Sequence, residues 1–433
     1  PPVRLEVASE IDSELLTRLK AELSIRDEDI SHYKEPLDLT GLNKIADLDR
    51  PELKFAPFRN QIVQELREID LESNDEYFAA IRRNEILLHH PYDSFNSSVV
   101  RFLEAAATDP HVLAIKQTLY RTSGDSPIVN ALIEAAEAGK QVLAVIEIRA
   151  RFDEQANVRW ARKLEDVGVH VVYGLVGFKT HAKLSLIVRE EGDSVRRYSH
   201  VGTGNYNPKT ARMYEDLGVL SADDALGEDL NKLFNQLSGF APQYSYNRLL
   251  VAPRSIRPGL LEKIDREIQN KQSGKHAFIR LKLNSLLDEE FVEALYKASS
   301  AGVEVDLVIR GICALVPGIT GISENIRVRS VLGRFLEHSR IFHFANGGDD
   351  EIYIGSADLM DRNLNRRVES LVKIIRDEHK KSLMKIFDQY TASTTAAWHL
   401  LPTGKWLLVD KDSNGAPLSD LQATIIQAYR AKV

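Results

Sequence analysis

Short apolar runs alternate with amphipathic stretches along the chain from about residue 80 onwards. The run VLAIKQTLY (112–120) is typical of a buried strand. The next stretch, SPIVNALIEAAEAGK (126–140), has the apolar spacing of a helix, with Ser126 in the N-cap position. A further apolar run, QVLAVIEIRA (141–150), predicts the next strand. This alternation predicts a sheet flanked by helices.

The same order of elements occurs a second time. Aligning Gly139, which ends the first helix, with Gly302 gives an offset of 163 residues and places Ile146 on Ile309. Each half then reaches a histidine that precedes a base by two positions, in HAK (181–183) and HSR (338–340), and each triplet is followed by a turn of small residues. The other expected elements are a helix at 157–168, strands at 169–175, 181–189 and 276–284, a helix at 288–302 and a strand at 303–311. This internal repeat predicts two similar α/β halves.

The repeat divides the chain into three segments. Residues 1–80 are mixed and charged, as in a small or incomplete domain. The two halves are expected at 81–248 and 249–433, because the stretch 244–259 fits the gap between them. A terminal helix at 420–432 is expected to complete the second half. The predicted fold class is mixed α and β, with one sheet flanked by helices in each half.

Composition and charge limit the function. The net charge of −7 argues against a general nucleic-acid binder. A single cysteine, Cys313, cannot form an intramolecular disulfide, so a reducing cytosol is the expected location. Arginines cluster locally in EIRARFDE (147–154) and MDRNLNRRVES (360–370). Such clusters on an acidic chain suit a pocket for an anion, although solvated surface arginines produce the same pattern.

The two histidine triplets suit phosphoryl transfer. A neutral imidazole nitrogen can attack phosphorus, and the usual histidine pKa of about 6.5 leaves His181 mostly neutral at pH 7. Neighbouring cations such as Lys183 lower that pKa further and stabilise charge on the transferred group. Positions i and i+2 of a strand share a face, so both side chains are expected to point into one site. One triplet alone is typical of an ordinary strand; two in a repeated framework favour a catalytic site.

The paired triplets resemble the phospholipase D superfamily, in which histidine-x-lysine motifs from two halves meet at one active site. Hydrolases of that superfamily usually carry an aspartate five residues after the lysine. In this chain the corresponding residues are Val188 and Ala345, and Arg340 replaces the second lysine. These departures weaken a phosphodiesterase interpretation.

Longer blocks are similar to the polyphosphate kinase family over essentially all of residues 85–390. The blocks are HHPYDSF (89–95), IKQTLYRTSGDSPIVNAL (115–132), VIEIRARFDEQANVRWAR (145–162), KTHAKLSLIVR (179–189), HVGTGNYNPKTARMYEDLG (200–218) and LEHSRIF (336–342). In addition, VRLEV (3–7) and PLDLTGL (36–42) resemble the end of that family's head domain. The resemblance implies that residues 1–80 are a head-domain remnant and that the chain lacks the family's N-terminal helical domain.

The resemblance also implies roles for individual residues. His181 occupies the position of the phosphohistidine intermediate, and His338 matches a histidine that contacts the nucleotide's phosphates. We expect a bound polyanion to raise the pKa of His338, so that it donates a proton while His181 stays neutral. Further matches are Tyr214, Arg310, Arg367 and Lys183 for ATP or phosphate, Arg121 and Arg151 beside the magnesium site, and Asn205 and Lys209 on the polyphosphate path. Arginine has no lone pair for a metal, so Arg121 and Arg151 are expected to bind phosphate oxygens.

The implied activity is reversible transfer of the terminal phosphate of ATP to inorganic polyphosphate. The implied cofactor is Mg²⁺, with ligands mostly from ATP and water. The implied partners are ATP or ADP and polyphosphate, with no nucleic acid. The implied assembly is a cytoplasmic homo-oligomer, a dimer or a tetramer. Peripheral association with the inner membrane stays open. Two alternatives stay open as well: a phospholipase-D-type phosphodiesterase, and a fragment that binds polyphosphate without catalysis.

Overall fold

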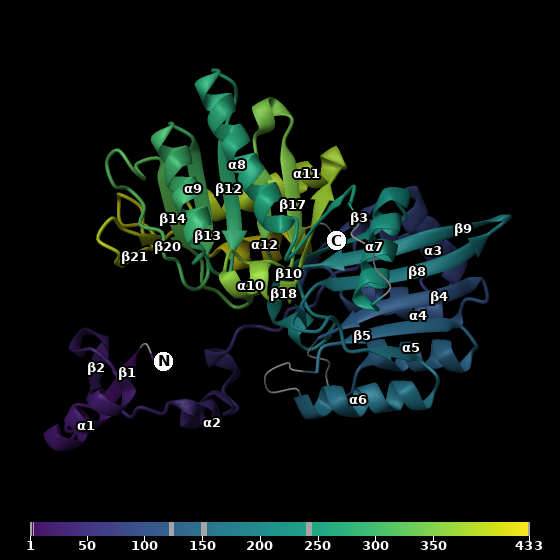
Figure 1. Ribbon diagram of the computed structural model, residues 1–433, viewed down its shortest axis with the longest axis horizontal. Coiled ribbons are helices and arrows are strands. Elements are labelled where there is room, and N and C mark those ends of the chain that lie inside the picture. Colours follow the sequence, from purple (N-terminus) through teal and green to yellow (C-terminus); the bar gives the residue numbers. More distant parts are fainter. Residues whose placement is uncertain (1, 3, 121–124, 149–153, 240–244, 432–433) are drawn as a thin grey trace. The chain divides into compact units, whose positions relative to one another are not determined.

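The computed structural model describes residues 2, 4–120, 125–148, 154–239 and 245–431 (Figure 1). The chain divides into two compact units, Pro1–Pro57 and Phe58–Val433. In the first unit, β1 (Leu5–Ala8) pairs in parallel with β2 (Ile30–Tyr33). Helix α1 (Ser13–Leu23) connects them, and the short helix α2 (Asn43–Ala46) follows.

The first half of the second unit is built on a mixed sheet. Among the described residues the strand order is β15-β10-β9-β8-β4-β5-β6, and β3 pairs with β10. Its strands are β3 (Ile86–His90), β4 (Val112–Leu119), β5 (Gln141–Ile146), β6 (His170–Val172), β8 (Lys183–Glu191), β9 (Ser194–Gly202), β10 (Tyr214–Ser221) and β15 (Leu336–Glu337). Its helices are α3 (Asn74–Arg83), α4 (Arg101–Thr108), α5 (Pro127–Glu137), α6 (Glu154–Asp166) and α7 (Asp224–Leu237).

The second half repeats this plan. Its strand order over the described residues is β11-β19-β17-β16-β12-β13-β14-β20-β21. The strands are β11 (Leu249–Val251), β12 (Phe278–Leu283), β13 (Glu304–Ile309), β14 (Ile326–Ser330), β16 (Ile341–Phe344), β17 (Glu351–Gly355), β19 (Ser370–Ile374), β20 (Ala397–Leu400) and β21 (Trp406–Val409). The helices are α8 (Ile256–Gln272), α9 (Glu289–Ser300), α10 (Asp361–Asn365), α11 (Asp377–Thr391) and α12 (Leu421–Arg430). The predicted fold class of two α/β halves is confirmed.

The structure contains the predicted internal repeat. Strand β5 ends at Ile146 and β13 at Ile309, the two residues that the offset of 163 aligns. Gly139 and Gly302 both have positive φ, 83° and 86°, where glycine ends a helix at little steric cost. Helix α5 begins as predicted, because the Ser126 side chain accepts a hydrogen bond from the backbone N–H of Val129.

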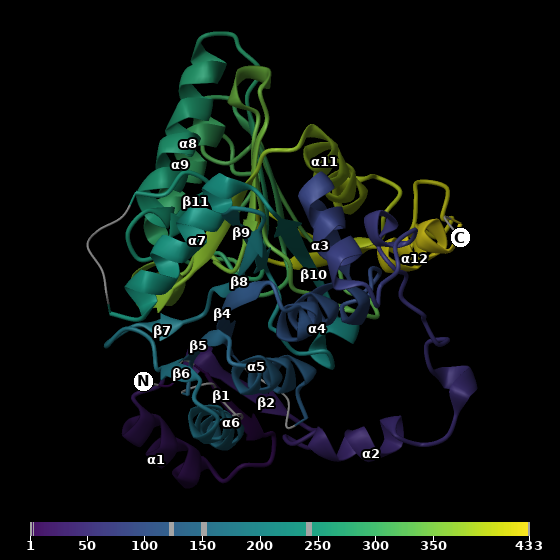
Figure 2. The same ribbon diagram turned by 90° about the vertical axis from the view of Figure 1, so that its right-hand side faces the viewer.

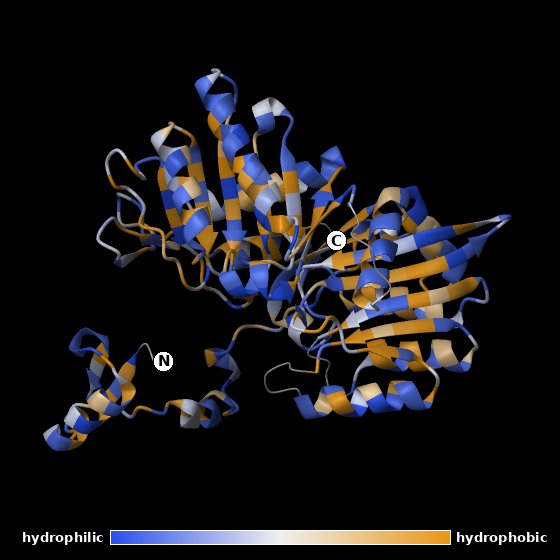
Figure 3. Ribbon diagram, viewed as in Figure 1, coloured by the Kyte–Doolittle hydropathy of each residue, from blue (hydrophilic) through white to orange (hydrophobic). Residues whose placement is uncertain are grey.

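Apolar residues lie mainly on the strands and on the helix faces that cover them (Figure 3). Helices α4 and α5 lie side by side on the first sheet, and α8 and α9 on the second (Figures 1 and 2). A further cluster of buried apolar residues is shared by the two halves and includes Leu184 and Val201 from the first sheet with Ile341 and Ile352 from the second. The two sheets therefore share a buried core.

Several element boundaries differ from the sequence pattern. The strand predicted at 141–150 ends at Ile146, and the strand predicted at 181–189 begins only at Lys183, so His181 lies outside it. The backbone N–H groups of His181 and Ala182 both donate to the carbonyl oxygen of Val368, at 2.9 Å each. This cross-half pairing replaces the expected sheet hydrogen bonds.

The sequence pattern also predicts a boundary at residue 80. In the structure Val63, Leu66 and Tyr77 pack into the core of the first half, and the compact unit begins at Phe58. The division between the halves near residue 248 stays a prediction. None of the described helices combines the length and the apolar character that crossing a membrane requires.

Candidate active site

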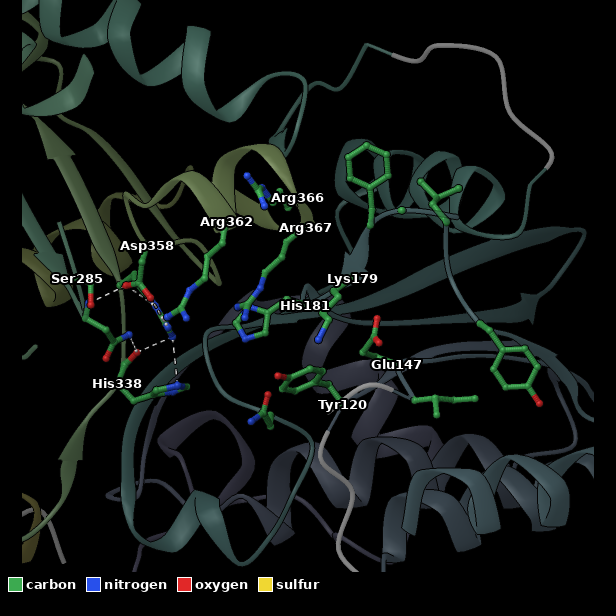
Figure 4. A pocket seen from close by; sticks show the side chains of 18 of the residues that line it. Tyr120, Glu147, Lys179, His181, Ser285, His338, Asp358, Arg362, Arg366 and Arg367 are labelled. Atoms are coloured by element: carbon green, nitrogen blue, oxygen red, sulfur yellow. Dashed lines mark hydrogen bonds and ion pairs between the residues drawn. The ribbon is translucent and has the colours of Figure 1, made fainter. Parts of the chain in front are cut away.

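A cavity of about 910 Å³ lies where the two halves meet (Figure 4). Both histidines of the repeat line it. The other lining residues include Tyr120, Glu147, Lys179, Asn205 and Tyr214 from the first half, and Asn284, Arg310, Arg340, Asp358, Arg362, Arg366 and Arg367 from the second. Five arginines against two carboxylates among these described residues make the cavity suitable for an anion.

His181 is held by a carboxylate of the other half. It follows β7 (Lys179–Thr180), and its Nδ1 lies 2.8 Å from Glu369 Oε2. Glu369 is fully buried, and the Asn363 side chain donates to its other oxygen at 2.7 Å. An ionised carboxylate accepts a hydrogen bond from a protonated Nδ1, which leaves Nε2 as the nitrogen with a lone pair. The ring of Tyr120 packs edge-on against the imidazole, at 5.0 Å between centroids.

His338 is held in the corresponding way by the first half. It follows β15, and its Nδ1 lies 2.8 Å from Asp216 Oδ1 in β10. Its backbone N–H donates to the carbonyl oxygen of Glu215 at 3.0 Å. Tyr214, the first residue of β10, precedes Glu215 and Asp216, and its ring centroid lies 5.2 Å from that of His338. Tyr214 and His338, which the family resemblance links to the nucleotide, therefore lie next to each other.

Two short strand pairs cross between the halves. Strand β7 of the first half pairs in parallel with β18 (Arg367–Val368) of the second, and β15 of the second half pairs in parallel with β10 of the first. The segment that carries each histidine is therefore hydrogen-bonded to a strand of the opposite half. Each imidazole is also hydrogen-bonded to a carboxylate of that opposite half. The orientation of both rings depends on the two halves being joined.

Burial and nearby cations keep His181 neutral. The pKa of His181 is lowered well below 6.5, first by burial and then by the charges of Lys183, Arg367 and Arg340. This agrees with the prediction that neighbouring cations lower it. A neutral imidazole is the form that attacks phosphorus.

The pKa of His338 is also lowered, opposite to the direction expected with a polyanion bound. Burial is the largest cause and outweighs Asp216, which acts to raise the pKa, while Arg340 lowers it further. The protein alone therefore favours neutral His338. The negative charge of a bound ligand would raise this pKa and favour a proton on the ring.

The two basic residues of the triplets differ in position. Lys183 is 1% exposed and is not among the cavity-lining residues; its ammonium donates to the His181 carbonyl oxygen and lies 5.2 Å from the Tyr120 ring centroid. The common site predicted for His181 and Lys183 stays a prediction: His181 precedes strand β8, so the alternation of a strand does not place it, but the charge of Lys183 acts on His181. Arg340 does line the cavity, donates to the His338 carbonyl oxygen at 2.8 Å, and forms an ion pair with Asp358 at 3.0 Å. Burial would raise the pKa of Asp358, but Arg340 lowers it to about 2.

The structure brings most of the predicted site residues together. Tyr214, Arg310, Arg367 and Asn205 line the cavity with the two histidines. Lys209 is not among the cavity-lining residues, and Arg121 and Arg151 lie outside the described residues.

The described cavity lining offers few free carboxylates for a magnesium ion. In the described part of the chain, no group of three or more histidine, cysteine, aspartate or glutamate side chains is placed to hold a metal ion. Of the two carboxylates in the lining, Asp358 is paired with Arg340, and Glu147 Oε2 accepts the backbone N–H of Thr180 at 3.0 Å. Magnesium commonly keeps several waters and binds through substrate phosphates. A magnesium ion held mainly by the phosphate oxygens of a ligand would match this lining.

Sequence reasoning missed Glu369, Asp216, Tyr120 and Asp358. One signal was available for the two histidine partners: an acidic residue follows the small-residue turn in both halves, Asp216 in YEDLG (214–218) and Glu369 in VES (368–370). A buried group behind His338 was also missed. Lys282 Nζ lies 2.7 Å from Glu215 and 3.0 Å from Glu337, the residue before His338.

His200 lies inside the first sheet instead of in the cavity, with its Nδ1 2.7 Å from the Tyr206 hydroxyl. Burial, followed by the charge of His90, lowers the pKa of His200 to about 3. The unfolded chain binds this proton near pH 6.5, so the folded state loses stability as the pH falls from about 6.5 towards 3.

Replacing His200 with glutamine is therefore expected to reduce the loss of stability in acid. Between pH 7 and pH 5 the free energy of unfolding should fall by about 2 kcal/mol less in the variant than in the wild type. Urea unfolding at the two pH values measures this difference. An equal fall in the free energy of unfolding of both proteins would contradict the lowered pKa of His200.

The fold and the site define a class: a paired-histidine α/β protein with a cationic cavity between two repeated halves. The chain belongs to the polyphosphate kinase family, since the model of polyphosphate kinase C-terminal domain 1 matches residues 76–243 and that of polyphosphate kinase C-terminal domain 2 matches residues 249–419.

Individual relatives agree. The chain is 57% identical over 432 residues to a polyphosphate kinase of Streptomyces coelicolor and 53% identical over 434 residues to one of Mycobacterium avium. Both matches cover 100% of this chain and 58% of the relative, so the chain spans little more than half the length of these proteins. The crystal structure of polyphosphate kinase from Porphyromonas gingivalis is 32% identical, with a TM-score of 0.83 over 100% of this chain and 65% of that one.

Proposed function

We propose that the chain is the catalytic part of an ATP–polyphosphate phosphotransferase that works through a phosphohistidine at His181. The observation that supports this most strongly is the geometry of His181. Its Nδ1 is engaged by Glu369 at 2.8 Å, and the ring lines a cavity rich in arginines. A neutral, oriented imidazole beside cations is the arrangement that nucleophilic attack on a phosphoryl group requires.

The proposed reaction has two steps. In the first, His181 Nε2 attacks the terminal phosphorus of ATP, a P–N bond forms, the bond to the β–γ bridging oxygen breaks, and ADP leaves. In the second, a terminal oxygen of polyphosphate attacks the same phosphorus, the P–N bond breaks, and the chain is one phosphate longer. Glu369 stabilises the positive charge that develops on the imidazole. Both steps run in either direction.

The other residues of the cavity bind the phosphates and offset their negative charge. Arg310, Arg340 and Arg367 stabilise the phosphoryl oxygens, and bidentate contacts to phosphate suit their guanidinium groups. His338 donates a proton to the leaving oxygen once the bound phosphates offset the effect of burial on its pKa. A magnesium ion held by the nucleotide's phosphates would neutralise part of their charge beside these arginines. Arg121 and Arg151 are proposed to bind phosphate oxygens near it.

A fragment that only binds polyphosphate is the second candidate, since the five arginines of the cavity lining would bind such a polyanion whether or not His181 reacts. One experiment separates the candidates: incubation with ATP, Mg²⁺ and a short polyphosphate primer, followed by measurement of ADP and chain length. The catalytic proposal predicts that one phosphate is added to the polyphosphate for each molecule of ADP that forms. Primer binding without ADP would support the binding fragment. In a parallel incubation with a phosphodiester substrate, hydrolysis would support the phosphodiesterase.

The location and assembly also stay proposals. We place the protein in the cytosol, because its single cysteine, Cys313, cannot form an intramolecular disulfide. A homo-oligomer and peripheral contact with a membrane are proposed from the family resemblance alone.

A further inference from the structure

One amide side chain connects the two nucleotide-side groups of the cavity. Asn284 follows β12, lines the cavity and is 5% exposed. Its Oδ1 accepts a hydrogen bond from Arg310 Nε at 2.8 Å, and its Nδ2 donates to the His338 carbonyl oxygen at 3.3 Å. Its own backbone N–H donates to Asp358 Oδ1 at 2.7 Å. Both ends of the amide are therefore used, in a fixed orientation.

The two arginines beside this amide are held in different ways. Arg340 forms an ion pair with Asp358, so a carboxylate compensates its charge. Arg310 forms no ion pair with any described residue, and the group that holds its Nε is the neutral amide of Asn284. The Arg310 guanidinium contacts no carboxylate of the described residues directly, so Asp358 and Asp216 act on it only at longer range and its charge stays available to an anionic ligand. The N–H groups on its two terminal nitrogens can then contact phosphate oxygens in the fixed planar geometry of the guanidinium.

The position of Asn284 also couples Arg310 to His338. The same side chain that orients the arginine is bonded to the backbone of the histidine, and His338 Nδ1 is in turn held by Asp216. A displacement of the amide would therefore move the phosphate-binding guanidinium and loosen the segment that holds the imidazole.

We propose that Asn284 is a positioning residue that directs the Arg310 guanidinium at the nucleotide's phosphates without neutralising it, and keeps it aligned with His338. This inference rests on the proposed function, in which the anion bound by Arg310 is a nucleoside triphosphate. A carboxylate at this position would preserve the shape and the acceptor for Arg310 Nε. It would also compensate the arginine's charge and repel the phosphates.

The test is ATP binding, measured by calorimetry on the folded chain with Mg²⁺. Asn284→Ala should weaken ATP binding about 10-fold, the usual size of a hydrogen bond to a charged group. Asn284→Asp should weaken it at least as much, although it is nearly isosteric. Asn325→Ala is the matched control, because the Asn325 amide also donates to a backbone carbonyl oxygen, that of Ser299 at 2.9 Å, but lies outside the cavity. Its ATP affinity should equal that of the wild type.

A double-mutant cycle separates positioning from a general loss of structure. If Asn284 acts through Arg310, Asn284→Ala should weaken ATP binding less than about 2-fold when Arg310 is already alanine. A full 10-fold loss in both backgrounds, or wild-type affinity in Asn284→Asp, would overturn this inference and leave the proposed function intact. Absence of ATP binding in the wild-type chain would overturn both.

Discussion

Replacing His181 with alanine is expected to lower the rate of phosphoryl transfer between ATP and polyphosphate by at least about 10⁴-fold, because it removes the nucleophile of a two-step reaction. The backbone of His181 bonds to Val368 and is unaffected by the change, so the fold should persist. The measurement is the rate of ADP formation with a polyphosphate primer, with unfolding by urea as the check on folding.

His338→Ala is the informative comparison. It removes a proton donor and leaves the nucleophile and its carboxylate in place, so a smaller loss of about 10²–10³-fold is expected. This loss should diminish towards low pH, where water supplies the proton more readily. If His338→Ala were as inactive as His181→Ala, with no pH dependence, the two roles would not be distinct.

Replacing Glu369 with glutamine is expected to slow transfer by about 10²–10⁴-fold. The glutamine amide can donate a hydrogen bond to His181 Nδ1 where the carboxylate accepts one, which places the proton on Nε2 and blocks its lone pair. The change also removes the charge that stabilises the developing imidazolium. Since Glu369 belongs to the second half and His181 to the first, this variant tests the cross-half arrangement of the site.

The control for Glu369→Gln is another carboxylate–histidine pair. Asp350 Oδ1 lies 3.0 Å from His343 Nε2, and neither residue is among the cavity-lining residues. Asp350→Asn should therefore leave the rate of ADP formation unchanged. Comparable losses in both variants would mean that the effect of Glu369→Gln is a general loss of stability.

The repeat was predictable from sequence because it depends on local patterns. Apolar periodicity, the Ser126 N-cap and the two glycines with positive φ define α5 and its equivalent α9 without reference to the rest of the chain. The two histidine triplets identified the site for the same reason, because each follows the repeated strands and helix at a corresponding position in its half.

The partners of the histidines were not predictable, because they come from the opposite half. Glu369 is 188 residues from His181 and Asp216 is 122 residues from His338 in sequence. No local period relates residues so far apart. The start of the strand expected at residue 181 was wrong for the same reason. The backbone N–H of His181 donates a hydrogen bond to the carbonyl oxygen of Val368, which belongs to the other half.

The measurement that tests the central claim most directly is covalent labelling with ATP that carries a labelled γ-phosphate, in the presence of Mg²⁺. The account predicts an acid-labile, base-stable label on the wild-type chain, none on His181→Ala, and slower labelling of His338→Ala. Added unlabelled polyphosphate should then remove the label from the protein. Equal labelling of the wild type and His181→Ala, or polyphosphate synthesis by a wild-type chain that never becomes labelled, would contradict the phosphohistidine at His181.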